Sequence, residues 1–93
     1  MNVMPIETII EQVSKACKKN GVERLDLFGS FATGTAAPTS DIDFVVYGCK
    51  DILNLEEQIS NIDTLRKIDI FEYESIKNEF LKEDIGKYGK QIY

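Results

Sequence analysis

The stretch LDLFGSFATGTAAPTSDIDFVVY, residues 25–47, decides the fold of this chain. Its apolar run ends in Gly-Ser at 29–30, and after a segment of small residues an Asp-Ile-Asp triplet at 41–43 precedes FVVY. Strand side chains alternate between two faces, so carboxylates two residues apart point the same way. Carboxylates beside substrate phosphates are usual Mg²⁺ ligands, and a Gly-Ser corner before a helical turn offers backbone N–H groups to phosphate oxygens. The stretch therefore predicts phosphoryl or nucleotidyl transfer.

Helical and strand patterns follow one another on both sides of this stretch. An amphipathic helix is predicted over residues 5–19, because its apolar side chains recur at a three-four spacing. Strands are predicted over 24–28, 41–47 and 67–73 from the composition and alternation of their side chains. The second of these strands has apolar residues on both faces and is therefore expected to be central.

The residues between these elements predict the connections. A short helical turn is expected over 30–34 and a loop over 35–40. Asp51 is expected to cap a second long helix, a third helix is predicted over 74–85, and residues 91–93 are expected to add an edge strand. The apolar faces predicted for these two helices are Ile52, Leu53, Leu55, Ile59, Ile62 and Leu65, and then Ile76, Phe80, Leu81 and Ile85. The residues expected to break the last helix are Gly86 and Gly89.

This order of elements favours one α/β (α+β) domain over residues 1–93, with a small sheet of three or four strands. Helices on one face of such a sheet would leave the other face partly open for a substrate.

Composition excludes several classes of function. The net charge is −5 and no basic stripe is visible, so a direct nucleic-acid partner is not expected. Histidine is absent, which excludes Ser-His-Asp and Cys-His catalysis and zinc sites built on histidine. Cys17 and Cys49 form no metal or redox spacing and are expected to be a buried helix thiol and a loop thiol. No signal peptide or membrane-spanning run is apparent, so a cytoplasmic protein without a membrane partner is expected.

The spacing Gly29-Ser30, ten residues, Asp41-x-Asp43 resembles the signature of the DNA polymerase β nucleotidyltransferase superfamily. More narrowly, GSFATGTAAPTSDIDFVV resembles the minimal nucleotidyltransferase (MNT) domains, and the length and element order of nearly the whole chain fit them. The resemblance implies the nucleotidyltransferase fold, a small mixed sheet flanked by helices.

The resemblance also implies the site residues. The motif Gly29 and Ser30 would bind a nucleotide triphosphate, and Ser40 suits a side-chain hydrogen bond that fixes the loop beside them. Asp41 and Asp43 would hold Mg²⁺. A third acid on a later strand maps onto Asp69, with Glu72 as a competitor that strand parity places on the opposite face.

The chemistry implied for this acid set is two-metal nucleotidyl transfer. Asp41 and Asp43 would bridge two Mg²⁺ ions, and Asp69 would ligate the second ion and take the proton of an acceptor hydroxyl. ATP would be the donor, and AMP would be the transferred group.

MNT domains commonly carry arginine at the position of Thr33, and this sequence has no Lys or Arg between Arg24 and Lys50. A guanidinium is a strong bidentate phosphate ligand, so its loss is expected to cost about 1.5–3 kcal/mol of nucleotide binding. A cation from elsewhere in the chain or from a partner could replace it.

The resemblance further implies a partner. MNT domains are typically paired with a helical HEPN-family protein, in which case the HEPN protein is an RNase toxin and the MNT protein its antitoxin. The implied reaction is transfer of AMP to a tyrosine hydroxyl of that toxin, within a hetero-oligomer or by a homodimer. Two alternatives stay open: a binding module that neutralises its partner by contact alone, and a nucleotidyltransferase acting on a small molecule such as an antibiotic.

Overall fold

The computed structural model describes residues 4–34 and 41–93. The elements in chain order are α1 (Ile6–Lys19), β1 (Arg24–Phe28), α2 (Ser30–Thr33), β2 (Ile42–Tyr47), α3 (Ile52–Ser60), β3 (Ile68–Glu72), the 3₁₀ turn η1 (Tyr73–Ser75), α4 (Glu79–Tyr88) and β4 (Lys90–Gln91). The predicted order of helices and strands is confirmed. The loop predicted over 35–40, with Ser40, lies outside the described residues.

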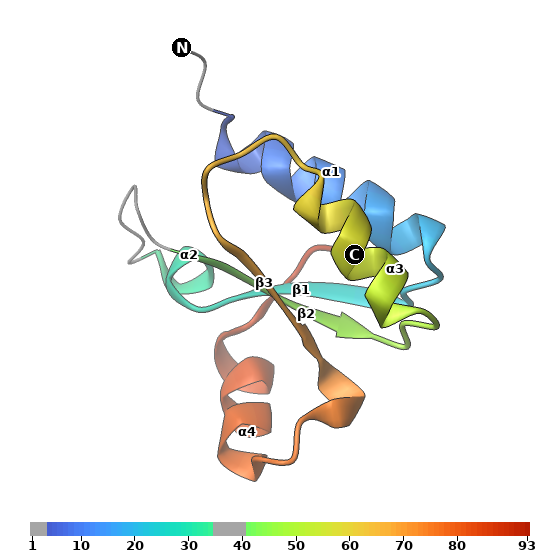
Figure 1. Ribbon diagram of the computed structural model, residues 1–93. Coiled ribbons are helices and arrows are strands. Elements are labelled where there is room, and N and C mark those ends of the chain that lie inside the picture. Colours follow the sequence, from blue (N-terminus) through green and yellow to red (C-terminus); the bar gives the residue numbers. More distant parts are fainter. Residues whose placement is uncertain (1–3, 35–40) are drawn as a thin grey trace.

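The strands form one mixed sheet in the order β3-β2-β1-β4. Figure 1 labels β1, β2 and β3. β1 runs antiparallel to β2 and to β4, whereas β2 and β3 are parallel and are joined through α3. Parallel neighbours need a long crossover connection, and α3 provides it. The prediction that the second strand is central is confirmed, because β2 pairs on both of its edges.

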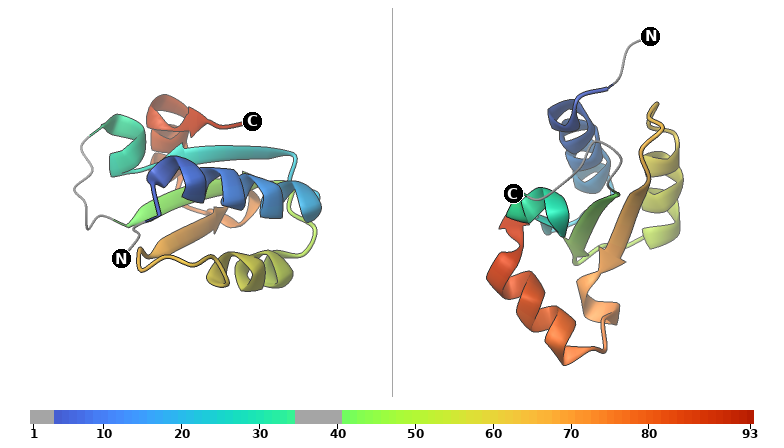
Figure 2. Two further views of the ribbon diagram at one scale, coloured as in Figure 1. Left: turned by 90° about the horizontal axis from the view of Figure 1, so that it is seen from above. Right: turned by 90° about the vertical axis from the view of Figure 1, so that its left-hand side faces the viewer.

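One face of the sheet carries the main hydrophobic core. α1 and α3 lie side by side on this face (Figures 1 and 2). The buried apolar side chains that meet there come from both helices and from alternate positions of β1 and β2. They include Ile9, Val13 and Cys17 of α1, Leu55 and Ile59 of α3, and Leu25, Leu27, Ile42, Phe44 and Val46 of the strands. Burial of this set supplies most of the driving force for folding.

The opposite face of the sheet is partly covered by α4, which lies across from α1 and α3 (Figure 2). Ile85 of α4 is 2% exposed, and Val45 of β2, which points away from the main core, is fully buried. α4 therefore covers part of the face that was expected to be partly open, while Asp69 on the same face stays partly exposed. β3 and β4 lie at opposite edges of the sheet, so the chain crosses this second face through η1 and α4 to pair β4 with β1.

The last helix begins later than the sequence pattern predicts. Residues 73–75 form a 3₁₀ turn, and α4 starts only after Asn78, whose side-chain oxygen accepts hydrogen bonds from the N–H groups of Phe80 and Leu81. The helix then continues through Gly86 and ends at Tyr88, with Gly89 as its C-cap residue. An interior glycine costs only about 1 kcal/mol, so it does not by itself stop a helix whose other side is packed.

Three residues assigned to apolar helix faces are exposed: Leu53 by 76%, Leu65 by 99% and Phe80 by 79%. Leu53 lies beside the α3 stripe that carries Leu55 and Ile59, rather than on it. Leu65 follows the end of α3, where helical spacing no longer determines orientation.

Candidate functional site

The Gly-Ser corner joins β1 to the short helix α2. Gly29 has φ +72° and ψ −151°, a backbone conformation that essentially only glycine adopts. A Cβ atom at this position would stand 2.5 Å from the Oδ2 atom of Asp43. Glycine is therefore required here both by the turn and by the close approach of the aspartate. Ser30, the first residue of α2, is half-buried beside it.

Asp43 and Asp69 lie side by side at the start of the two parallel strands. They are direct register partners in the β2–β3 ladder, while Phe28 is the partner of Asp43 on the other edge of β2. Paired residues point to the same face of a sheet, here the face away from α1 and α3. Glu72 is the partner of Val46, a residue of the main core, and so belongs to the opposite face.

The charges of this cluster oppose one another. Partial burial raises the pKa of Asp43 above its usual value, and repulsion from Asp69 and Asp41 and a hydrogen bond with Asp69 raise it further. The Lys67 ammonium acts in the opposite direction. Its Nζ atom lies 3.9 Å from Oδ1 of Asp69, whose side chain is 33% exposed. The site is a solvent-accessible group of carboxylates with the Lys67 ammonium beside it.

Asp41 precedes β2 and its side chain is exposed. It acts on the cluster through the repulsion between its charge and that of Asp43. Within residues 4–34 and 41–93, no group of three His, Cys, Asp or Glu side chains forms a ready-made metal site. Mg²⁺, however, is usually held by only one or two protein carboxylates together with substrate phosphates and water. The donor set of Asp43 and Asp69, with Asp41 at its edge, fits that mode, and a cation would relieve its repulsion.

Thr33 stands where the resemblance leads one to expect arginine. Its Oγ1 atom lies 3.4 Å from the carbonyl oxygens of both Gly29 and Ser30, so the hydroxyl turns back into its own helical turn. The N–H groups of Ala32 and Thr33 also bond to the Gly29 carbonyl. The Thr33 hydroxyl and these N–H groups therefore stabilise the turn that follows Gly29.

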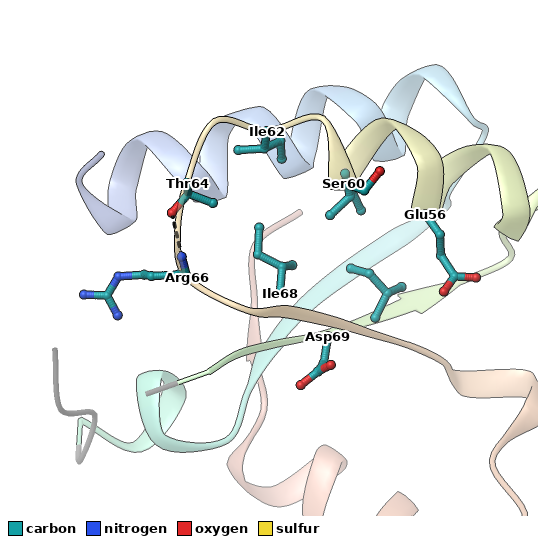
Figure 3. Close-up of a pocket in the computed structure, with 9 residues that line it drawn as sticks. Glu56, Ser60, Ile62, Thr64, Arg66, Ile68 and Asp69 are labelled. Atoms are coloured by element: carbon teal, nitrogen blue, oxygen red, sulfur yellow. Dashed lines mark hydrogen bonds between the residues drawn. The ribbon is translucent and has the colours of Figure 1, made fainter. Parts of the chain in front are cut away.

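A pocket of about 460 Å³ lies between α3, the loop that follows it and β3 (Figure 3). The lining side chains are Glu56, Ile59, Ser60, Ile62, Thr64, Arg66, Ile68, Asp69 and Ile70. Figure 3 shows Ile68 and Asp69 on opposite sides of β3, with Ile68 among the residues above the strand. The pocket therefore meets the carboxylate cluster only along the edge of β3. Its lining residues all lie within 56–70, but they surround a cavity only because α3 and the loop after it fold back beside β3, which the sequence pattern did not predict.

A second polar group that the sequence did not reveal surrounds Asp26, which is 1% exposed. Its carboxylate accepts hydrogen bonds from Arg24 Nε at 3.0 Å and from the Tyr47 hydroxyl at 2.8 Å. Tyr47 stacks on Tyr73 with ring centroids 4.6 Å apart, and Arg24 lies over the Tyr47 ring. Burial, followed by the hydrogen bond to Asp26, raises the Tyr47 pKa. The hydrogen bonds join β1 to β2 and the stack of Tyr47 on Tyr73 holds η1 against the sheet, which indicates a structural role.

Residues 11–93 match the sequence model of the polymerase β nucleotidyltransferase family, and the chain belongs to this family. Its membership places the protein in a class of transferases. A search among curated proteins finds no match.

Solved structures share the fold. A chain of a toxin–antitoxin structure determined with AMP-PNP has a TM-score of 0.70 and 24% identity, over 89% of this chain and 71% of that one. A mutant form of the MntA–HpeT toxin–antitoxin has a TM-score of 0.66 and 20% identity, over 89% and 70%. A proposed minimal nucleotidyltransferase has a TM-score of 0.62 and 22% identity, over 97% and 96%. At these identities the likeness establishes the mixed α/β nucleotidyltransferase fold.

In the part of the chain that the structure describes, no helix is long and apolar enough to cross a membrane.

Proposed function

We propose that this protein is an Mg²⁺-dependent nucleotidyltransferase that moves AMP from ATP to a hydroxyl group of a partner protein. The acceptor is a tyrosine of a HEPN-type toxin, for which this chain acts as antitoxin. Family membership supports the reaction class. The fold likeness to toxin–antitoxin structures, one of them holding AMP-PNP, supports the partner and the nucleotide. The observation that carries the proposal is the Asp43–Asp69 pair directly beside Gly29.

Each residue has a distinct task in this reaction. Gly29 and Ser30 hold the triphosphate, with the absent side chain of Gly29 leaving room for Asp43. Asp41, Asp43 and Asp69 would hold Mg²⁺, which supplies charge neutralisation at the phosphates and lowers the pKa of the acceptor hydroxyl.

The transfer step exchanges one bond at phosphorus for another. The acceptor oxygen forms a bond to the α-phosphorus of ATP, and the bond from that phosphorus to the bridging oxygen breaks, releasing pyrophosphate. Asp69 takes the hydroxyl proton. Positioning and charge neutralisation dominate such phosphoryl chemistry, so it requires no histidine.

Calorimetric titration of ATP into the full chain, with Mg²⁺ and then with EDTA, tests the nucleotide site. We expect Mg²⁺-dependent binding that Asp43→Asn weakens at least tenfold, because the amide cannot replace the carboxylate as a charged ligand. Asp63→Asn is the matched control, an exposed aspartate outside the cluster, and should bind like the wild type. Equal binding by the wild type and Asp43→Asn would contradict the proposed role of Asp43.

The transfer itself is tested with ATP radiolabelled at the α-phosphate and a purified HEPN-type partner. Label on a partner tyrosine, lost with Asp43→Asn, is the expected result. In cells, the same variant should fail to neutralise the toxin.

A second candidate is a binding module that neutralises its partner by contact. The observation that favours it is Thr33, whose hydroxyl faces its own turn and brings no positive charge to the corner. Under this alternative, Asp43→Asn would still neutralise the toxin in cells, and no label would be transferred.

A further inference from the structure

Lys67 stands beside the carboxylate cluster, directly before β3. Ile42 pairs with Ile68 and Asp43 with Asp69, and the Ile42 N–H donates to the Lys67 carbonyl at 2.9 Å. The same register therefore places Lys67 opposite Asp41, one position before the first pair. Lys67 and Asp69 are two residues apart and share the face of the sheet that carries the site.

The position of the ammonium agrees with this placement. Its Nζ atom is 3.9 Å from Oδ1 of Asp69, and the Lys67 side chain is 70% exposed. An exposed ion pair at this distance is weak, because water screens the attraction and moving the long side chain away costs little interaction free energy. The ammonium can therefore leave Asp69 for a stronger anionic partner without disturbing the packing.

A triphosphate at the Gly29 corner would bring such an anionic partner. The sequence between Arg24 and Lys50 supplies no Lys or Arg, so the corner itself offers no side-chain cation. The carboxylates of Asp41, Asp43 and Asp69 add to the negative charge that a nucleotide would meet. A nearby ammonium with three hydrogen-bond donors suits a phosphate oxygen.

We propose that Lys67 is a nucleotide-binding residue whose ammonium moves from Asp69 to the phosphates of ATP when the nucleotide binds. The inference rests on the proposed function and identifies the side chain that neutralises the triphosphate. Release from Lys67 also leaves the Asp69 carboxylate available to a metal ion.

Direct phosphate contact by Lys67 and mere screening of the carboxylates predict different results. If Lys67 only screens the carboxylates, its removal leaves a more negative site, so Mg²⁺ should bind as well or better, and any loss of ATP affinity should be small and should disappear at high salt. If Lys67 binds phosphate, its removal must lower the affinity for ATP, even though Asp69 is then released from its ion pair with Lys67.

The experiment compares Lys67→Met and Lys67→Arg in the full chain, with Lys77→Met as an exposed lysine outside the site. ATP, ADP and AMP are titrated calorimetrically in the presence of Mg²⁺. We expect Lys67→Met to lower the affinity for ATP about tenfold, as the loss of one charge-assisted hydrogen bond would, and to change the affinity for AMP much less. Lys67→Arg should restore most of the loss, and Lys77→Met should match the wild type. The thermal unfolding midpoints of all variants should agree closely, because the replaced side chains are exposed.

Two outcomes overturn the inference. Unchanged or tighter ATP binding by Lys67→Met, with a wild type that binds ATP, overturns the role of Lys67 and leaves the proposed function intact. No ATP binding by the wild-type chain overturns both together. An equal loss of affinity for ATP and AMP also counts against the inference, because only ATP carries the β- and γ-phosphates.

Discussion

At the scale of single residues, the site depends on the missing side chain of Gly29. The positive φ of this residue is one reason for glycine, and the 2.5 Å that would separate a Cβ atom from the Asp43 carboxylate is another. The sequence motif could predict a glycine turn before a helix, because turn chemistry is local. It could not predict that the glycine makes room for Asp43, because that residue arrives from the neighbouring strand.

We expect Gly29→Ala to lower the free energy of unfolding by about 1–3 kcal/mol, from backbone strain and displacement of the Asp43 carboxylate. Gly34→Ala is the matched control, since Gly34 also has a positive φ, of +77°, but a Cβ there meets nothing within 4 Å. Gly34→Ala should lower the free energy of unfolding by about 1 kcal/mol, because of the positive φ alone. Urea denaturation measures both, and calorimetry should show weaker Mg²⁺-ATP binding only for Gly29→Ala. Equal effects of the two variants would contradict the close-approach argument.

At the scale of elements, the strands agree with their sequence patterns better than the last helix does. β1 begins and ends where alternation predicts, and β2 and β3 differ only at their ends. α4 starts later than predicted because a side-chain cap at Asn78 and the preceding 3₁₀ turn fix its beginning. Apolar spacing alone cannot distinguish a helix from a turn whose side chains happen to continue the same periodicity.

We expect Asn78→Ala to lower the free energy of unfolding by about 1 kcal/mol, because two N–H groups at the start of α4 lose their acceptor. Asn78→Asp keeps an acceptor oxygen and adds a charge that the helix N-terminus favours, so it should equal or exceed the wild type. Chemical denaturation with far-ultraviolet circular dichroism measures the difference. A similar loss in both variants would show that the cap contributes little.

At the scale of the whole molecule, the core links stability to alkaline pH through Cys17. The thiol is fully buried, and burial, followed by repulsion from Cys49, raises its pKa from 9.0 to about 12. The unfolded chain therefore releases this proton at lower pH than the folded chain does. The stabilisation is complete below pH 9 and is lost as pH rises toward 12, at up to about 1.4 kcal/mol per unit.

The measurement is the free energy of unfolding between pH 8 and 11 for the wild type and Cys17→Ala, with a reductant present. Cys17→Ala should be less stable at pH 8, since it leaves a small cavity, but should lose less stability as pH rises. Burial raises the pKa of the Tyr93 phenol to about 12 as well, so some pH dependence should remain in the variant. Parallel curves for the two proteins would contradict the assignment to Cys17.

The amino-acid sequence by itself determined the local features of this protein: which segments form strands or helices, that the second strand is central, and that the chain belongs with nucleotidyltransferases. These features follow from side-chain periodicity, turn residues and the motif spacing, all of which are encoded within short segments. Strand parity also placed Asp69 and Glu72 on opposite faces, whichever strand pairs with theirs.

Only the tertiary structure decided which segments meet. The parallel pairing of β2 with β3 sets Asp43 beside Asp69 and Lys67 opposite Asp41, and the return of the chain across the second face places α4 there. The hydrogen bond from Tyr47 to Asp26 also joins two strands that are separated in the sequence. Such contacts depend on how the whole chain buries its apolar surface at once, and no local pattern carries that information.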